Sequence, residues 1–266
     1  MNTEVKGDSL VGRLSGKRIL VAGSATGIGA ATAYRLAVEG ARLYLGDINT
    51  EGLNKVVNEL KSKGADVAGG WFDLADEESI DQLVANAVDF LGDLDGLANI
   101  AADLRPETIG KDVDLLNLDL AVWDRTLRAN LMGYVLLSKY AIPHLIEAGG
   151  GAIVNTSSDA SFSGEATRPA YAASKAAINA LSRHIASAYG KQGIRANTIR
   201  PGGVMTEQML ASQPEEFKAI LLEAVKVARV GEPGDIAGAI AYLLSEDGQW
   251  ITGQTWSVNG GSGYRE

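Results

Sequence analysis

Short apolar runs alternate regularly with longer helical segments along the whole of this 266-residue chain. The apolar runs are typical of β-strands and occupy residues 18–22, 41–46, 66–72, 94–101, 151–157, 194–200 and 254–258. The helical segments occupy residues 29–39, 51–63, 77–91, 120–146, 168–189 and 233–244. Repeated strand–helix units of this kind predict an α/β fold built on a parallel sheet.

Several predicted strands, such as 19–21 and 152–154, are apolar on both faces. This pattern is expected when helices cover both sides of a parallel sheet. We therefore predict a Rossmann-type, doubly wound sheet of about seven strands with helices on both faces. Because no change of composition divides the chain, we expect a single domain over residues 1–266. Within it we expect an N-terminal extension at 1–14 and a substrate loop or lid at 203–230.

Composition and charge argue against several classes of protein. The chain has 33 acidic and 24 basic side chains, which leaves no basic footprint for a nucleic acid. It has no cysteine and two histidines, so a disulfide framework and a zinc site of clustered Cys and His are not expected. No run approaches the roughly 18 apolar residues of a membrane span, and the N-terminus lacks a signal-peptide core. We expect a cytoplasmic protein with a small-molecule ligand and no metal.

A glycine-rich turn joins the first predicted strand to the helix that follows. Residues 22–29 read Ala-Gly-Ser-Ala-Thr-Gly-Ile-Gly. Glycines allow the backbone to approach a pyrophosphate, and a helix N-terminus offers free N–H groups and a positive dipole end. Tight turns also need glycine for steric reasons alone, so the turn by itself is weak support.

Asp47 strengthens the interpretation of this turn as a dinucleotide site. It ends the second predicted strand, where a carboxylate can accept hydrogen bonds from both ribose hydroxyls of NAD and repel the 2′-phosphate of NADP. No Arg or Lys lies within 24–28 to bind that phosphate. The alternative is that Asp47 caps a helix or turn in the segment Asp-Ile-Asn-Thr. The sequence favours NAD as the cofactor.

Tyr171 and Lys175 stand four residues apart near the start of an Ala-rich helix, and so on one helix face. In a chain of this length and composition, chance alone is expected to produce roughly one third of a Tyr-x-x-x-Lys match, so the pair by itself means little. Ser158 ends a predicted strand and should lie over the same edge of the sheet. A nearby ammonium stabilises the phenolate of a tyrosine, whose free pKa is about 10. Tyr171 could then take a proton from an alcohol while Ser158 hydrogen-bonds the same oxygen.

In these motifs the sequence resembles the short-chain dehydrogenase/reductase family, in its single-domain branch, over roughly residues 15–261. The family's Thr-Gly-x-x-x-Gly-x-Gly turn corresponds to residues 22–29, with Ala22 in place of Thr. Its Asn-Asn-Ala-Gly element corresponds to residues 99–102, where Ile100 and Ala102 depart from the pattern. These departures affect scaffold positions, so we expect altered stability or cofactor affinity and intact chemistry.

The resemblance implies roles for individual residues. Tyr171 would be the acid/base catalyst, and Lys175 would bind the nicotinamide ribose and lower the pKa of Tyr171. Ser158 would orient the substrate, and Asn130 would hold a water that relays protons from Lys175 to solvent. The implied cofactor-binding residues are Gly23, Ala25, Thr26, Gly27, Ile28, Gly29, Asp47, Asp73, Leu74, Asn99, Ala101, Tyr171, Lys175, Pro201, Gly202, Val204 and Thr206.

The favoured function is that of an NAD(H)-dependent oxidoreductase that interconverts a secondary alcohol and a ketone. One alternative is a 3-oxoacyl-thioester reductase of fatty-acid type, which usually takes NADPH, so Asp47 argues against it. The other is a non-catalytic NAD-binding regulatory protein, which a missing Tyr171 or Lys175 would favour. Polyols, diols, cyclic alcohols and steroids all remain open as substrates. The resemblance implies a homotetramer, or else a homodimer, paired through helices 120–146 and 168–189.

Overall fold

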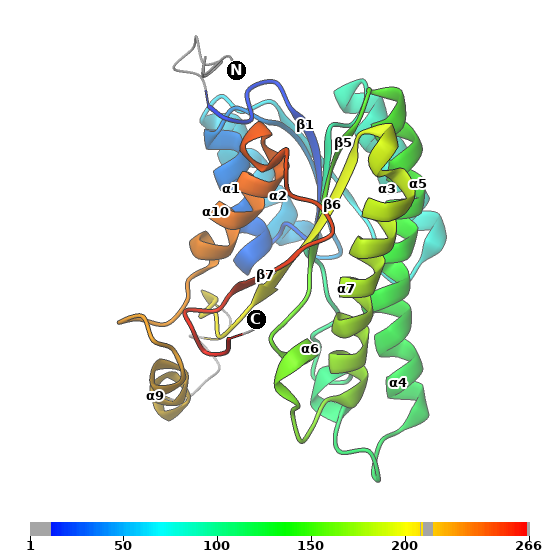
Figure 1. Ribbon diagram of the computed structural model, residues 1–266. Coiled ribbons are helices and arrows are strands. Elements are labelled where there is room, and N and C mark those ends of the chain that lie inside the picture. Colours follow the sequence, from blue (N-terminus) through cyan, green and yellow to red (C-terminus); the bar gives the residue numbers. More distant parts are fainter. Residues whose placement is uncertain (1–11, 208, 210–214, 265–266) are drawn as a thin grey trace.

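Seven parallel strands form one sheet in the computed structural model, which describes residues 12–207, 209 and 215–264 (Figure 1). The strands are β1 (Arg18–Ala22), β2 (Arg42–Asp47), β3 (Val67–Trp71), β4 (Gly96–Asn99), β5 (Gly151–Thr156), β6 (Ile194–Pro201) and β7 (Thr255–Val258). Their order is β3-β2-β1-β4-β5-β6-β7. The direction of winding reverses between β1 and β4, where such sheets bind ligands outside the carboxyl ends of the strands. The predicted doubly wound sheet is confirmed.

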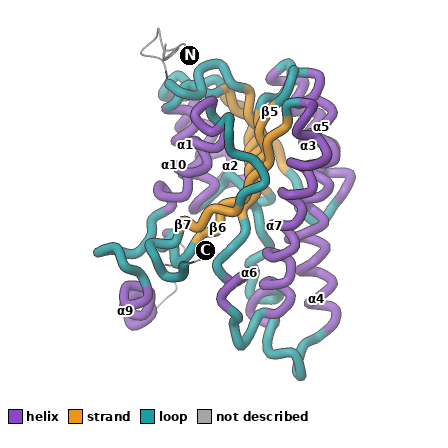
Figure 2. Tube along the Cα trace, in the orientation of Figure 1, coloured by secondary structure: helices purple, strands orange, loops and turns teal. Residues whose placement is uncertain are grey.

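Helices cover both faces of the sheet, which Figure 2 shows as two layers around the strands. One face carries α1 (Gly27–Val38), α2 (Thr50–Ser62) and α10 (Pro233–Leu244). The other face carries α3 (Glu77–Leu91), α5 (Gly133–Glu147) and α7 (Pro169–Tyr189). Shorter helices are α4 (Leu120–Leu127), α6 (Ala160–Ser163) and α9 (Glu215–Ala224), with 3₁₀ turns at η1 (Ile109–Lys111), η3 (Gly190–Gln192) and η4 (Glu246–Gly248).

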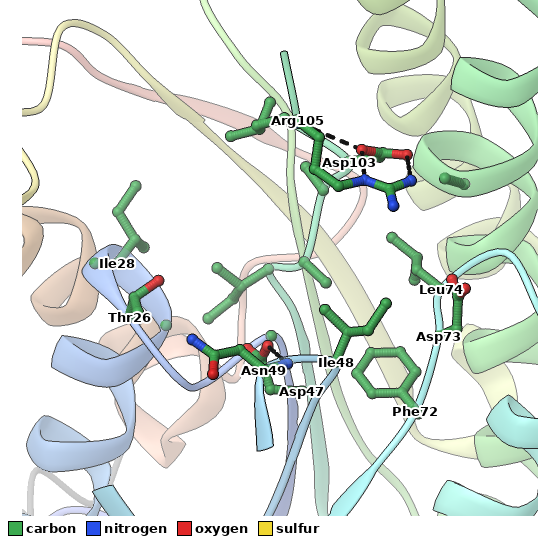
Figure 3. Close-up of a pocket in the computed structure, with 18 of the residues that line it drawn as sticks. Thr26, Ile28, Asp47, Ile48, Asn49, Phe72, Asp73, Leu74, Asp103 and Arg105 are labelled. Carbon is green, nitrogen blue, oxygen red and sulfur yellow. Dashed lines mark hydrogen bonds and ion pairs between the residues drawn. The ribbon is translucent and has the colours of Figure 1, made fainter. Parts of the chain in front are cut away.

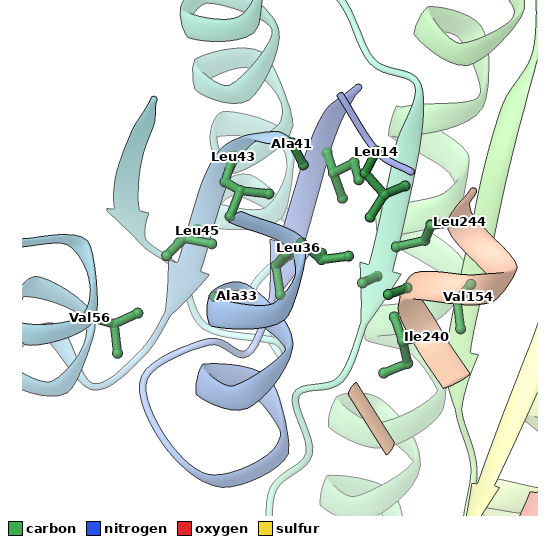
Figure 4. Packing of buried hydrophobic residues seen from close by; sticks show 14 of the residues in the cluster. Leu14, Ala33, Leu36, Ala41, Leu43, Leu45, Val56, Val154, Ile240 and Leu244 are labelled. Atoms are coloured by element: carbon green, nitrogen blue, oxygen red, sulfur yellow. The ribbon is translucent and has the colours of Figure 1, made fainter. Parts of the chain in front are cut away.

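The apolar core lies in two layers, one on each side of the sheet, as the strands with two apolar faces predict. Figure 4 shows the layer beneath α1 and α10, where Leu36 and Ile240 pack toward the strands. Leu14 belongs to this layer and is fully buried, and its N–H donates to the carbonyl of Glu39 at 3.0 Å. The predicted extension therefore includes at least one core residue. Its residues 1–11 lie outside the described part of the chain.

The predicted long helix over 120–146 is interrupted in the structure. Between α4 and α5 lies a π-helical turn, η2 (Arg128–Met132), which shifts the helix register. Just after it, Gly133 packs so closely on Leu74 that a Cβ would stand 2.5 Å from the Leu74 carbonyl oxygen. The lid expected at 203–230 contains α9, while its residues 208 and 210–214 lie outside the described residues.

Candidate active site

A cavity of about 780 Å³ opens at the carboxyl ends of β1 to β4 (Figure 3). Many of the predicted cofactor-binding residues line it, namely Gly23, Thr26, Gly27, Ile28, Gly29, Asp47, Asp73, Leu74, Ala101 and Thr206. They come from the glycine turn after β1, the ends of β2 and β3, and the segments after β4 and β6. The fold thus brings residues from five parts of the chain to one cavity.

The glycine turn is a close-packed backbone crossing. A Cβ on Gly29 would stand 1.6 Å from the carbonyl oxygen of Gly23, and a Cβ on Gly23 would stand 2.4 Å from the N atom of Ala101. Gly23 also has a φ of 94°, which favours glycine. The first turn of α1, at Gly27 and Ile28, borders the cavity, and its N–H groups precede any intrahelical acceptor. This wall can hold a phosphate group.

Asp47 ends β2 at the rim of this cavity. One carboxylate oxygen accepts the N–H of Ala25 at 2.8 Å, and the other accepts the N–H of Asn49 at 2.9 Å. The side chain that caps α2 is Asn49, which accepts the N–H of Gly52 at 3.0 Å. Asp47 therefore does not cap α2, but its bond from the N–H of Asn49 does close a turn, and its carboxylate borders the cavity as well.

The wall opposite the glycine turn carries a charged cluster that the motifs did not predict. In Figure 3, Asp103 and Arg105 lie across the cavity from Thr26 and Ile28. The Asp103 carboxylate bonds Arg105 Nη2 at 2.6 Å and Arg125 Nε at 3.0 Å. Burial would raise the pKa of Asp103, but these hydrogen bonds prevail and hold it far below its usual range.

Further lining residues also escaped the sequence interpretation: Ile48, Asn49, Phe72, Ile100, Ala102, Leu104, Ala129 and Glu207. Several directly follow a predicted residue, so the ends of β2, β3 and β4 could have suggested them. No sequence motif indicates the contact of Arg125, on α4, with Asp103, because only the fold brings these two segments together.

Ser158, Tyr171 and Lys175 come together beside β5 and α7. Lys175 is almost fully buried, and its Nζ donates to the carbonyl oxygen of Thr156 at 2.9 Å. The same ammonium lies 5.8 Å from the ring centroid of Tyr171 and 4.9 Å from that of Tyr134. The Ser158 hydroxyl lies close enough to the Tyr171 phenol to act on it as a hydrogen-bonding group that lowers its pKa. The predicted helix-face pair and the serine thus lie within reach of one another.

The charges at this end of the site follow mainly from burial. Burial lowers the pKa of Lys175 to about 7. It also raises the pKa of Tyr171 above its ordinary value of 10.0, although the hydrogen bond with Ser158 and the charge of Arg168 act in the opposite direction. The resemblance implied a lowered pKa for Tyr171. The difference arises because loss of water contact disfavours the phenolate more than its protein neighbours favour it.

Asn130 and Asn99 hold the scaffold around the site. Asn130 lies in the π-helical turn, and its Oδ1 accepts the N–H of Asp103 at 2.7 Å. Asn99 donates from Nδ2 to Asn155 Oδ1 at 2.8 Å, and Asn155 donates in turn to Ser182 Oγ at 2.9 Å. The proton relay expected at Asn130 stays a prediction.

The other predicted cofactor-binding residues, Asn99, Tyr171 and Lys175 among them, are not part of the lining of this cavity. Ala25 contributes its N–H to Asp47, and Pro201 ends β6. The N–H of Gly202 donates to the carbonyl of Val258 at 3.2 Å, and Val204 forms a parallel bridge with Gly231. These four residues therefore fix the backbone beside the site.

The described residues lack two features, a metal-binding cluster and a membrane-spanning helix. They contain no group of three or more His, Asp and Glu side chains arranged to hold a metal ion. None of the helices in the described part of the chain has the length and apolar character that crossing a bilayer requires.

Comparison with known proteins gives consistent matches along nearly the whole chain. Residues 22–263 match a protein family described as Enoyl-(Acyl carrier protein) reductase. A probable short-chain type dehydrogenase/reductase of Bradyrhizobium diazoefficiens is 38% identical over 251 residues, which are 94% of this chain and 89% of the relative. A cis-4-hydroxycyclohexanecarboxylate dehydrogenase of Sinomonas cyclohexanicum is 36% identical over 242 residues, 91% of this chain and 94% of the relative.

A solved structure is similar in fold as well as in sequence. It is a 7α-hydroxysteroid dehydrogenase complexed with NADH and 7-oxo glycochenodeoxycholic acid. The two structures superpose with a TM-score of 0.87 at 31% identity, over 94% of this chain and 95% of that chain.

Proposed function

The chain belongs to the short-chain dehydrogenase/reductase family, and we propose that it interconverts an alicyclic secondary alcohol and its ketone with NAD(H) as cofactor. Two of the compared proteins are named for hydroxyl groups carried by rings, one on a cyclohexane and one on a steroid. This supports a ring-borne hydroxyl as the substrate group. The protein is an oxidoreductase in this proposal, with Tyr171 as its acid/base residue.

The observation that carries the proposal is the convergence of Ser158, Tyr171 and Lys175. The phenol lies near the Ser158 hydroxyl, which can also bond a substrate oxygen, and the ammonium of Lys175 lies 5.8 Å from its ring centroid. A positioned acid/base group and a fixed hydroxyl donor are what proton transfer to or from an alcohol requires.

In the oxidation direction the phenolate of Tyr171 takes the hydroxyl proton of the alcohol. Ser158 hydrogen-bonds the same oxygen and holds it against the phenol while the carbonyl forms. In its protonated form Lys175 supplies a buried positive charge that favours the phenolate. When bound, NAD supplies the hydride acceptor and a positive ring charge. Tyr171 returns the proton in the reduction direction.

The cavity fits a dinucleotide. Its glycine turn leaves no room for side chains where Gly29 meets Gly23, and the start of α1 borders it as a phosphate site. Asp47 presents a carboxylate at the same rim, which suits the ribose hydroxyls of NAD and opposes a 2′-phosphate. Asp73 and Leu74 provide a further wall, where the family resemblance puts adenine.

A 3-oxoacyl-thioester reductase is the second candidate, because the matched family is described as Enoyl-(Acyl carrier protein) reductase, which also acts on an acyl thioester, although at a C=C bond. This reductase usually takes NADPH through basic residues near the glycine turn and the second strand, so Asp47 at the end of β2 argues against it. An assay with an acyl thioester and NADPH tests this candidate directly.

The central experiment follows nicotinamide absorbance, with NAD and NADP for the alcohol substrates and with NADH and NADPH for the keto substrates. Substrates are cis-4-hydroxycyclohexanecarboxylate, 7-oxo glycochenodeoxycholic acid, a straight-chain secondary alcohol and a 3-oxoacyl thioester. Tyr171→Phe should lower kcat by about a thousandfold with NADH binding nearly unchanged, because it removes the proton carrier and keeps the ring. Tyr140→Phe is the matched control, since this tyrosine bonds Glu77 on the surface.

Each outcome has a distinct meaning. Full turnover in Tyr171→Phe would remove this residue from the mechanism. Preference of the wild type for NADP would overturn the cofactor assignment. Tight NADH binding with no turnover of any substrate would favour the regulatory protein.

For the assembly we propose a homotetramer, with a homodimer as the alternative. Large apolar side chains stand exposed on the outer surface, with Trp250 96% and Leu120 72% exposed. Exposed apolar groups of this size are typical of surfaces that another subunit covers. Size-exclusion chromatography with light scattering tests this, and a monomer at micromolar concentration would contradict it.

A further inference from the structure

A buried carboxylate from the segment between β4 and α4 lies at the start of the helix that carries Tyr171. Asp112 is 2% exposed. Its Oδ2 accepts the N–H of Tyr171 at 2.8 Å, and its Oδ1 accepts the N–H of Ala170 at 3.2 Å. Its backbone carbonyl accepts the N–H of Arg168 at 2.9 Å. Asp112 thus accepts every backbone N–H from residue 168 to residue 171, since Pro169 has none.

The helix needs this partner because its own first turn offers no substitute. Helix α7 begins at Pro169, and the first N–H groups of a helix have no intrahelical acceptor. A capping side chain at position 168 would normally accept them, but Arg168 makes no such bond in the part of the chain that the structure describes. Asp112 accepts these N–H groups in its place, from a distant part of the sequence.

The backbone at Arg168 supports the same conclusion. Its φ of 64° makes it the one non-glycine residue with a positive φ among those described. Such a conformation is uncommon and persists where the surroundings fix it. The bond from Arg168 N–H to Asp112 contributes to that fixation. The Arg168 side chain pairs with Glu165, and its guanidinium carbon lies 5.7 Å from the centroid of the Tyr171 ring.

We propose that Asp112 is a positioning residue for proton transfer, because it fixes the first turn of α7 and with it the phenol of Tyr171 beside Ser158. This inference rests on the proposed function, which gives Tyr171 its acid/base role. Lys175 lies one turn further along α7 and is held separately by its bond to the Thr156 carbonyl. Loss of the Asp112 carboxylate should therefore disturb proton transfer and leave the region around Lys175 in place.

The experiment compares Asp112→Ala and Asp112→Asn with a matched control, Asp76→Ala. Asp76 also caps a helix, since its Oδ1 accepts the N–H of Glu78 at the start of α3, away from the catalytic residues. The readouts are kcat and KM on the substrate identified in the panel above, NADH affinity by fluorescence, and hydrogen exchange of residues 168–175. Thermal unfolding reports the purely structural effect of each variant.

We expect kcat of Asp112→Ala to fall about 30-fold, with NADH affinity within about twofold of the wild type. Exchange at residues 170 and 171 should become faster. Asp112→Asn keeps one acceptor oxygen, so its kcat should lie between that of the wild type and that of Asp112→Ala. This variant also serves as the test if Asp112→Ala folds poorly. Asp76→Ala should lose thermal stability and keep kcat.

A kcat for both Asp112 variants within about twofold of Asp76→Ala would overturn the positioning role. So would a loss of NADH affinity as large as the loss of kcat. Unchanged exchange at residues 170 and 171 would overturn it even without a known substrate. The proposed function fails separately: active Tyr171→Phe removes both ideas, whereas inactive Tyr171→Phe beside fully active Asp112→Ala removes only the role of Asp112.

Discussion

The cofactor cradle and the catalytic end of the site are built in different ways. We use the word cradle for the part of the cavity formed by the glycine turn, residues 23–29, with Asp47 beside it, and this part depends on the absence of side chains where Gly29 crosses Gly23. The catalytic end joins residues from distant segments, and it depends on hydrogen bonds such as that of Asn130 with Asp103. We therefore expect added side-chain atoms to disrupt the cradle and the loss of hydrogen-bond partners to disrupt the catalytic end.

Adding one methyl group to the cradle should have the largest effect. In Gly29→Ala the Cβ would overlap the Gly23 carbonyl, which is backbone and cannot rotate away. We expect a loss of more than about 3 kcal/mol of stability together with loss of NADH binding. Gly234 also lies in the first turn of a helix and meets nothing within 4 Å, so Gly234→Ala is the control. Normal NADH binding by a folded Gly29→Ala protein would contradict the comparison.

The catalytic end should reveal its buried ammonium in the pH dependence of stability. Burial lowers the pKa of Lys175 to about 7 in the folded protein, from an ordinary value of 10.5. Between these values the unfolded chain binds more protons, so without cofactor the free energy of unfolding should rise from pH 7 to about 9.5. The rise is at most about 3 kcal/mol.

Urea unfolding of wild type and Lys175→Met at several pH values measures this contribution, which the variant should lack. Above about pH 10 the sign reverses, because the pKa values of Tyr171 and Tyr134 are raised in the folded protein and unfolded tyrosines ionise first. Equal slopes for both proteins between pH 7 and 9.5 would show that Lys175 is not the titrating group.

Removing a hydrogen-bond acceptor at the catalytic end should lower the free energy of unfolding by about 2 kcal/mol. Asn130→Ala leaves the buried N–H of Asp103 without the acceptor that now lies 2.7 Å away. Asn117→Ala is the control, since that side chain bonds Asp114 on the surface of the preceding segment. Chemical denaturation compares the two, and equal stabilities would mean that the bond from the Asp103 N–H to Asn130 does not stabilise the fold.

The smallest expected effect concerns cofactor choice at the cradle. Asp47→Ala should reduce the preference for NAD over NADP by about tenfold, because it removes a charged acceptor for the ribose hydroxyls. The ratio of kcat/KM for the two cofactors measures it. Asp66→Ala serves as the control, because its carboxylate pairs with Arg42 at the other end of the neighbouring strands. An unchanged ratio would show that Asp47 does not select the cofactor.

What could be predicted from the sequence was local. The strand 18–22 and the glycine turn follow from apolar runs and glycine spacing within a few residues, and the structure confirms both. The π-helical turn that interrupts the helix predicted over 120–146 was not predicted, and beside it Gly133 packs against Leu74, two residues that only the fold brings together.

The site divides in the same way. The residues of the cradle and the pair Tyr171 and Lys175 stand in short motifs, so their positions could be predicted. Arg125 reaches Asp103, and Asp112 reaches the start of α7, only after separate helices have packed. No residue spacing within a single sequence indicates either of these contacts.

The strand order also affects biosynthesis. In the finished sheet Val21 of β1 lies between Leu45 of β2 and Ala98 of β4. Until the ribosome has added β4, one edge of β1 has N–H and C=O groups without strand partners, on a segment that is apolar on both faces. Such an edge can pair with another nascent chain. A chain released before residue 96 would keep this edge of β1 unpaired, and it would also lack Ala101, whose backbone packs against Gly23 in the glycine turn.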